Sequence, residues 1–116
     1  MNKRRTGSRY EQTAAMYLEA KGMRIVARNF YTRGSEIDLI ARDGKYLVFI
    51  EVKYRSDAAK GYALEAVDMR KRRAVIAAAR IFLYRYKFSE DTPCRFDVIG
   101  IDGGKITHIE NAFWME

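Results

Sequence analysis

The sequence has few of the residues that build disulfides, histidine-rich metal sites or membrane spans. Its single cysteine, Cys94, excludes an internal disulfide and a zinc site made of several cysteines. Its single histidine, His108, leaves a histidine metal site or a Ser/His/Asp triad no second histidine to draw on. No apolar run approaches the ~18 residues of a membrane-spanning helix, and no apolar stretch follows the basic start MNKRRTGSR to make a signal peptide. These absences favour a protein of the reducing cytoplasm with no membrane segment.

Size and charge are more informative. The chain has 116 residues, which is the length of one domain, and 48% of them are hydrophobic, which is enough for one core. Its 22 lysines and arginines outnumber its 15 acids, so the formal net charge is +7. Such an excess favours an anionic partner, and nucleic acid is the commonest one for a small basic domain. The alternative is a basic surface that serves solubility.

Hydrophobic periodicity predicts the element order α-β-β-β-α-β-β. We expect a flexible basic tail at residues 1–6 and a single domain over residues 7–116, which opens with a helix capped by Ser8 and ended by Gly22. Strands are expected at 23–31, 35–42 and 45–54 and in a final hairpin, with a long helix at about 65–87. The strands before and after that helix can pair in parallel through a right-handed crossover. The predicted fold class is therefore α/β, with a mixed sheet flanked by helices.

The segment VFIEVKYR, residues 48–55, ends an apolar strand with an acid and a base. Glu51 and Lys53 lie two residues apart, so both point to one face of an extended strand. A pair of this kind often forms only an ion pair at a strand end. By itself it is therefore weak evidence of catalysis.

Pairing with the preceding strand brings a third charged group to this face. Asp43-Gly44 predicts a tight turn between the two strands. A two-residue turn places Asp38 opposite Phe49, whereas a four-residue loop places it opposite Glu51. Both registers put Asp38 on the face of Glu51, within about 8 Å of it, because a shift by two residues preserves facing. The remaining alternative is a structural network of strand-end charges.

Two carboxylates this close repel each other, and Lys53 offsets only part of that repulsion. Mg²⁺ binds through carboxylates, water and phosphate oxygens, so Asp38 and Glu51 are candidate ligands. A bound metal lowers the pKa of its water and stabilises the developing charge on a phosphodiester, and Lys53 would hold or activate the attacking water. Glu11, on the flank of the first helix's buried face, could add a further ligand. Its alternative role is that of an ordinary acid in a first helical turn.

Further charged residues surround this set. Glu36 shares the face of Asp38, where it would support Asp38 or a second metal. Arg55 extends the face of Glu51 toward either a phosphate or solvent. Arg95 and Asp97 alternate with apolar residues on a late strand, which predicts an ion pair that orders the site from behind.

The long helix carries basic residues that could contact the nucleic-acid backbone without reading its sequence. The candidates are Arg70, Lys71, Arg73 and Arg80. The alternative for the arginines is a solvated helix face. Lys71 flanks the apolar face of this helix. It could therefore reach inward to a phosphate or simply extend along that face to water.

Three segments resemble the YraN-like family of small bacterial proteins: GSRYEQTAAMYLEAKGMRIVARNF, GSEIDLIARDGKYLVFIEVKYR and RFDVIGI, together with Lys71. The helix-borne Glu, the Asp and the Glu-x-Lys are also similar to those of archaeal Holliday-junction resolvases. The resemblance covers residues 7–113 and implies a restriction-endonuclease-like fold with a PD-(D/E)xK nuclease core. It further implies roles for five residues: metal ligation by Asp38, Glu51 and the Val52 carbonyl, catalysis by Lys53, and an accessory acid in Glu11.

Two positions depart from the pattern without removing a catalytic group. Ile37 stands at the position of the proline in the PD-(D/E)xK motif, as is usual in YraN-like sequences. Ser35 stands where that family usually has glycine. The prediction is an endonuclease that uses Mg²⁺ or Mn²⁺ on DNA, including branched or structured DNA. Symmetric cutting of a four-way junction would require a homodimer. The alternatives are a non-catalytic nucleic-acid-binding module of the same fold and a subunit whose basic face binds an acidic protein.

Overall fold

The computed structural model describes the backbone of residues 3–55 and 68–115, and the side chains of residues 9–54 and 68–115. In chain order the elements are α1 (Lys3–Ala20), β1 (Arg24–Tyr31), β2 (Glu36–Asp43), β3 (Tyr46–Arg55), α2 (Met69–Arg85), β4 (Cys94–Asp102) and β5 (Lys105–Phe113). This order confirms the α-β-β-β-α-β-β arrangement expected from the sequence.

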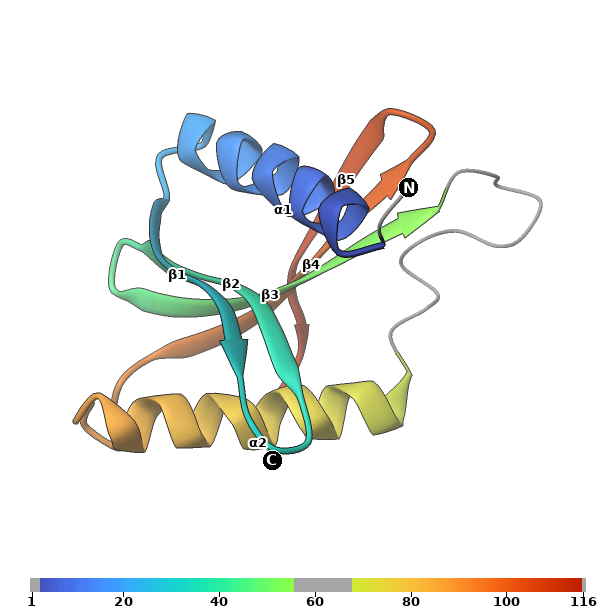
Figure 1. The fold of residues 1–116 in the computed structure, drawn as a ribbon. Coiled ribbons are helices and arrows are strands. Elements are labelled where there is room, and N and C mark those ends of the chain that lie inside the picture. The colour runs from blue at the N-terminus through green and yellow to red at the C-terminus, as the bar shows by residue number, and fades with distance from the viewer. Residues whose placement is uncertain (1–2, 56–67, 116) are drawn as a thin grey trace.

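The described strands form one mixed sheet in the order β1-β2-β3-β4-β5. Neighbouring strands are antiparallel except for β3 and β4, which pair in parallel on either side of the crossover that contains α2. Figure 1 shows α1 lying across one face of this sheet and α2 across the other. The fold is therefore the predicted mixed sheet flanked by helices.

Alternation along β3 divides the core between the two helices. Val48 and Ile50 pack with α1, whereas Leu47 and Phe49 pack with α2. On the α2 side, the Phe49 ring lies 5.5 Å from the Phe96 ring, centroid to centroid. Because the alternation continues, Glu51 falls on the α2 side, where the hydrophobic core gives way to charged residues.

The first helix is longer than expected and ends where expected. It begins at Lys3, so Ser8 lies inside the helix and not at its N-cap, and the expected tail overlaps the first turn. At the other end Gly22 has a φ of +96°, which glycine adopts without a steric penalty. The Gly22 N–H donates to the Glu19 carbonyl and the Met23 N–H donates to the Leu18 carbonyl, both at 3.0 Å. These bonds form a Schellman cap, and Met23 is buried as the chain enters β1.

The second helix begins at Met69, inside the predicted range of 65–87. Asp68 is its N-cap, with Oδ1 accepting a hydrogen bond of 2.9 Å from the Lys71 N–H. Residues 65–67 lie outside the described part of the chain. In the part that is described, neither helix combines the length and the apolar character that a membrane crossing requires.

Candidate functional site

The β2–β3 hairpin adopts the second of the two predicted registers. Asp43 pairs with Tyr46 and Leu39 pairs with Ile50, so the next position along the ladder sets Asp38 opposite Glu51. The turn residues are Gly44 and Lys45 instead of Asp43 and Gly44, and Gly44 has a φ of +57°. The register depends on this turn, because a turn starting one residue earlier would slide the strands by two positions.

Asp38 and Glu51 are both buried, with 8% and 1% of their surfaces exposed. Asp38 Oδ2 accepts a hydrogen bond of 2.8 Å from the Val52 N–H, which fixes the carboxyl beside the end of β3. Burial, followed by the negative charge of Asp38, raises the pKa of Glu51 to about 8. Burial also raises the pKa of Asp38, against the Val52 hydrogen bond that lowers it. Burial thus disfavours a negative charge on each of these neighbouring carboxyls, and the charge of one disfavours ionisation of the other.

Two lysines face Glu51 from different elements. Lys71 of α2 places its Nζ 3.6 Å from Glu51 Oε2, although the sequence suggested that Lys71 contacts nucleic acid. Lys53 of β3 is half-buried, and its charge and that of Lys71 both act to lower the pKa of Glu51. Glu51 Oε1 is buried and has no hydrogen-bond partner in the structure. One oxygen of this carboxyl is thus paired, and the other lacks the partner that a buried oxygen normally has.

Two further acids complete the cluster. Glu11 of α1, Glu36 of β2 and Asp38 each offer an oxygen, and these oxygens all lie within 4.8 Å of one another. Burial, then the charges of Asp38 and Glu36, raise the pKa of Glu11 to about 7. The structure therefore brings together all four acids that the sequence suggested for this site.

Asn29 is absent from the predicted set but belongs to the same cluster. It lies in β1 between the pairs Arg28–Leu39 and Phe30–Ile37, opposite Asp38. With its amide nitrogen turned toward the acids, Asn29 donates to Glu11 Oε1 at 2.7 Å and to Glu36 Oε2 at 3.0 Å. Its φ of +52° is a conformation that asparagine tolerates better than most residues. A polar residue in the middle of a predicted strand was the only sequence signal for this role.

The donor chemistry of the cluster fits a hard divalent cation. Carboxylate oxygens from α1 and β2 converge, Glu51 of β3 lies opposite Asp38, and Mg²⁺ and Mn²⁺ both prefer oxygen ligands. The unpartnered Glu51 Oε1 supports the same conclusion and does not depend on the spacing of the acids. A buried oxygen without a hydrogen-bond donor is one that a bound cation would satisfy. The Val52 backbone adjoins Asp38 through its N–H, and ligation by its carbonyl stays a prediction.

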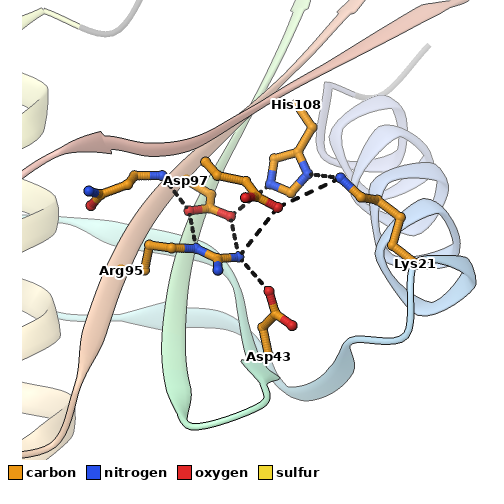
Figure 2. Close-up of polar contacts among 7 residues, drawn as sticks. Lys21, Asp43, Arg95, Asp97 and His108 are labelled. Atoms are coloured by element: carbon orange, nitrogen blue, oxygen red, sulfur yellow. Dashed lines mark hydrogen bonds and ion pairs between the residues drawn. The ribbon is translucent and has the colours of Figure 1, made fainter.

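The predicted Arg95–Asp97 ion pair is present (Figure 2). Alternation along β4 places both side chains on the α1 side of the sheet, away from Glu51. Arg95 donates through Nε to Asp97 Oδ1 at 2.9 Å and through Nη2 to Oδ2 at 3.0 Å. Burial acts to raise the pKa of Asp97, but hydrogen bonds from His108 and Arg95 outweigh it and hold that pKa below its ordinary value. Asp97 pairs with Ile50, the residue before Glu51, so the pair lies directly behind the acidic cluster.

His108 of β5 belongs to the same polar network as Asp97. Its side chain is 1% exposed, and Nε2 lies 2.7 Å from Asp97 Oδ2. Its Nδ1 lies 2.9 Å from Lys21 Nζ, just beyond the end of α1 (Figure 2). The network joins α1, β4 and β5. Its sequence signal was weak because its members lie up to 87 positions apart.

The basic residues of α2 divide between two surroundings. Arg70, Arg73 and Arg80 are exposed, as a surface that contacts a nucleic-acid backbone requires. Lys71 instead faces the acids. Arg55 closes β3, and its side chain lies outside the described residues.

Comparison with known proteins gives a consistent result over nearly the whole chain. The family model described as "Uncharacterised protein family UPF0102" matches residues 10–101. The chain is 44% identical over 113 residues to a UPF0102 protein of Lachnoclostridium phytofermentans, covering 97% of this chain and 96% of that protein. It is 43% identical over 111 residues to the UPF0102 protein YraN of Escherichia coli O1:K1 / APEC, covering 95% and 85% of the two chains. These matches confirm the resemblance to YraN-like proteins.

Proposed function

The chain belongs to the UPF0102 family, and we propose that it is a metal-dependent endonuclease that hydrolyses phosphodiester bonds in DNA. The observation that carries this proposal is the buried Glu51 carboxyl, with one oxygen unpartnered, beside a second buried carboxyl on Asp38. A purely structural acid at this position would raise the free energy of the fold. Burial disfavours its charge, and only part of its hydrogen-bonding capacity is used.

Asp38 and Glu51 would hold a Mg²⁺ or Mn²⁺ ion, with the Val52 carbonyl as a backbone ligand. When bound, such an ion supplies a water of lowered pKa and positive charge beside the scissile phosphate. The Val52 N–H fixes the orientation of Asp38 through its hydrogen bond of 2.8 Å. The oxygens of Glu11 and Glu36 lie within 4.8 Å of each other and of Asp38, so these acids would hold water of the same site or contribute to a second ion.

The two lysines have separable roles in this proposal. Lys71 pairs with Glu51 Oε2, which neutralises one oxygen and keeps the carboxyl in place. Lys53 follows Glu51 by two residues, on the same face of β3. Lys53 would therefore hold the attacking water or stabilise the charge that develops on the phosphate. Loss of either lysine should raise the pKa of Glu51, because both charges lower it, and loss of Lys53 should in addition remove the group that holds the attacking water.

The net charge of +7 and the exposed arginines of α2 support a polyanionic substrate. Arginines that contact the phosphate backbone bind DNA of many sequences with similar affinity. Such binding suits an enzyme that recognises the shape of DNA. Branched or otherwise structured DNA is therefore the substrate that we propose. A homodimer would be required if both strands of a junction are cut symmetrically.

A cleavage assay tests the proposal directly. Wild-type protein is incubated with linear, forked and four-way DNA in Mg²⁺, in Mn²⁺ and in EDTA, and products are resolved on denaturing gels. We expect cleavage only with metal. Asp38→Asn and Lys53→Met should each reduce the rate by at least about a hundredfold while circular dichroism stays unchanged. Glu19→Gln, an exposed acid on α1, is the matched control and should cleave as wild type does.

The alternative is a non-catalytic nucleic-acid-binding module, which the charge alone would equally support. That reading predicts binding that weakens with salt, no cleavage of any of the substrates with either metal, and no effect of Asp38→Asn on binding. An outcome of this kind would replace the nuclease proposal. Binding that does not depend on salt would contradict both readings.

A further inference from the structure

A groove of about 350 Å³ lies between α2 and the end of β5, apart from the acidic cluster. Its described lining combines three arginines with apolar side chains and contains no acid. The residues that matter here are Met69, Arg72, Arg73, Arg80, Phe113 and Trp114. A volume of this size is at the lower end of the range of about 300–1,000 Å³ typical of small-molecule sites. It can hold one planar ring system with room beside it.

Trp114 follows directly after β5 and is 70% exposed. It is the only tryptophan of the chain. A large aromatic ring left open beside arginines offers a face on which another ring can stack. Met69, across the groove, is 52% exposed and adds a second adaptable apolar contact.

Arg72 is held in the groove by apolar contacts and is not neutralised by an acid in the contacts described. Its guanidinium lies over the Phe113 ring, 5.7 Å from the centroid, and Nη1 lies 3.8 Å from Met69 Sδ. Its Nε is buried and has no hydrogen-bond partner. A buried arginine donor without an acceptor is costly, and a phosphate oxygen is an acceptor that would satisfy it.

The groove adjoins the acidic cluster through a single helix. Lys71 faces Glu51, whereas the next residue, Arg72, lines the groove. Consecutive residues of a helix point about 100° apart, so the groove and the acidic cluster lie beside the same turn of α2. One strand of nucleic acid could cross α2 and contact both.

We propose that this groove binds an unpaired nucleotide of the substrate, with its base stacked on Trp114 and its phosphates contacting Arg72 and Arg73. The choice of nucleic acid as the occupant rests on the proposed function. Charge complementarity favours a polyanion, and the exposed indole favours one with an accessible ring face. In duplex DNA the base faces are already stacked, so the groove would select single-stranded segments at forks, flaps or gaps.

Intrinsic fluorescence tests this proposal, because Trp114 is the sole tryptophan. Wild-type protein in EDTA and low salt is titrated with a short oligothymidylate, and separately with a blunt hairpin duplex of equal phosphate number. Binding is measured in parallel by the anisotropy of labelled DNA. We expect the oligothymidylate to quench the fluorescence and the duplex to leave it nearly unchanged. Unchanged fluorescence at an oligothymidylate concentration that saturates the anisotropy would overturn the proposal.

Substitutions separate stacking from general electrostatics. Trp114→Ala should weaken oligothymidylate binding roughly tenfold and Trp114→Phe much less, whereas duplex binding should stay the same. Tyr84→Ala is the matched control, because Tyr84 is 89% exposed on α2 and does not line the groove. Arg73→Gln should make the slope of the logarithm of the oligothymidylate binding constant against the logarithm of salt concentration shallower, by the amount expected for about one lost phosphate contact. Arg24→Gln, an exposed arginine of β1 outside the groove, serves as its control, and an equal effect of both variants would contradict a specific site.

These measurements require no cleavage, so they fail independently of the nuclease proposal. Quenching without metal-dependent cleavage would support the groove as a nucleotide site. It would also favour the non-catalytic binding module over the nuclease. Cleavage without quenching would support the nuclease and overturn the groove as a nucleotide site. Equal quenching by polyglutamate would also overturn it and point to an acidic protein as the occupant.

Discussion

Replacing Glu51 with glutamine tests whether this buried carboxyl is kept for a cation and not for stability. Glutamine has nearly the same shape as glutamate, carries no ionisable group, and can donate a hydrogen bond as a protonated carboxyl can. The charged groups that face residue 51 are Asp38, Lys53 and Lys71. The variant therefore removes one ionisable group and leaves its surroundings in place.

The magnitude follows from the pKa of Glu51, which is about 8 in the fold against an ordinary value of 4.5. Each unit of difference between these two pKa values corresponds to about 1.4 kcal/mol. Full ionisation of Glu51 in the folded protein therefore costs on the order of 3–5 kcal/mol of stability. The folded protein holds this proton more tightly than the unfolded chain. Its contribution to stability is therefore complete below about pH 4.5 and is lost as the pH rises through about 8. Glu51→Gln should match wild type at about pH 5 and exceed it by several kcal/mol at about pH 9.

Urea denaturation in EDTA across this pH range measures the difference. Glu19→Gln, on the exposed side of α1, serves as the control and should follow the wild-type curve. Adding Mg²⁺ at about pH 9 should stabilise wild type more than Glu51→Gln, because binding to the folded state stabilises it in proportion to its affinity. Equal pH dependence in wild type and Glu51→Gln would refute the electrostatic account of Glu51. A variant that is less stable than wild type at about pH 9 would do the same.

Three other substitutions test the supporting structure by urea denaturation at neutral pH. Asp97→Asn should destabilise the fold by about 3–5 kcal/mol, because it removes the buried carboxylate that Arg95, His108 and the Asn111 N–H share and leaves Arg95 with Asp43 as its near partner; a loss below about 1 kcal/mol would contradict this role of Asp97. Asp68→Ala removes the N-cap of α2 and should cost about 1 kcal/mol, whereas Asp68→Asn should keep most of that stability. Asn29→Ala should cost about 1–2 kcal/mol because of its positive φ and should also lower the rate of metal-dependent cleavage. Asn29→Gly relieves the backbone, so full recovery of the rate in that variant would refute a role for the amide.

The order of elements could be derived from the sequence because each element carries a local signal. Gly22 ends α1 through its positive φ, and alternation in β2 and β3 shows which residues share a face. Facing survives an error in register, since side chains repeat every two residues. For that reason Asp38, Glu51 and Lys53 could be placed on one face before their register was known.

Positions that depend on packing between distant elements were harder to derive. The position of Lys71 beside the apolar face of α2 allowed either an inward reach or an extension to water, and only the crossover geometry turns it toward Glu51. His108 reads as a strand residue, but its partner Asp97 lies on the adjacent strand, 11 positions earlier in the chain. The N-terminal limit of α1 also differed, because a basic segment without caps has no strong signal for either helix or tail.

The sequence alone determined the mixed α/β fold and the membership of the acid set, since periodicity and turn residues act over short separations. Tertiary structure decided how those acids are used. Burial between the sheet and α2 raises the pKa of Glu51, pairs one of its oxygens with Lys71 and leaves the other without a partner. Tertiary structure also placed Trp114 beside the arginines of α2, from a position more than thirty residues away along the chain. Desolvation and charge pairing depend on distances in space, and local sequence patterns do not contain those distances.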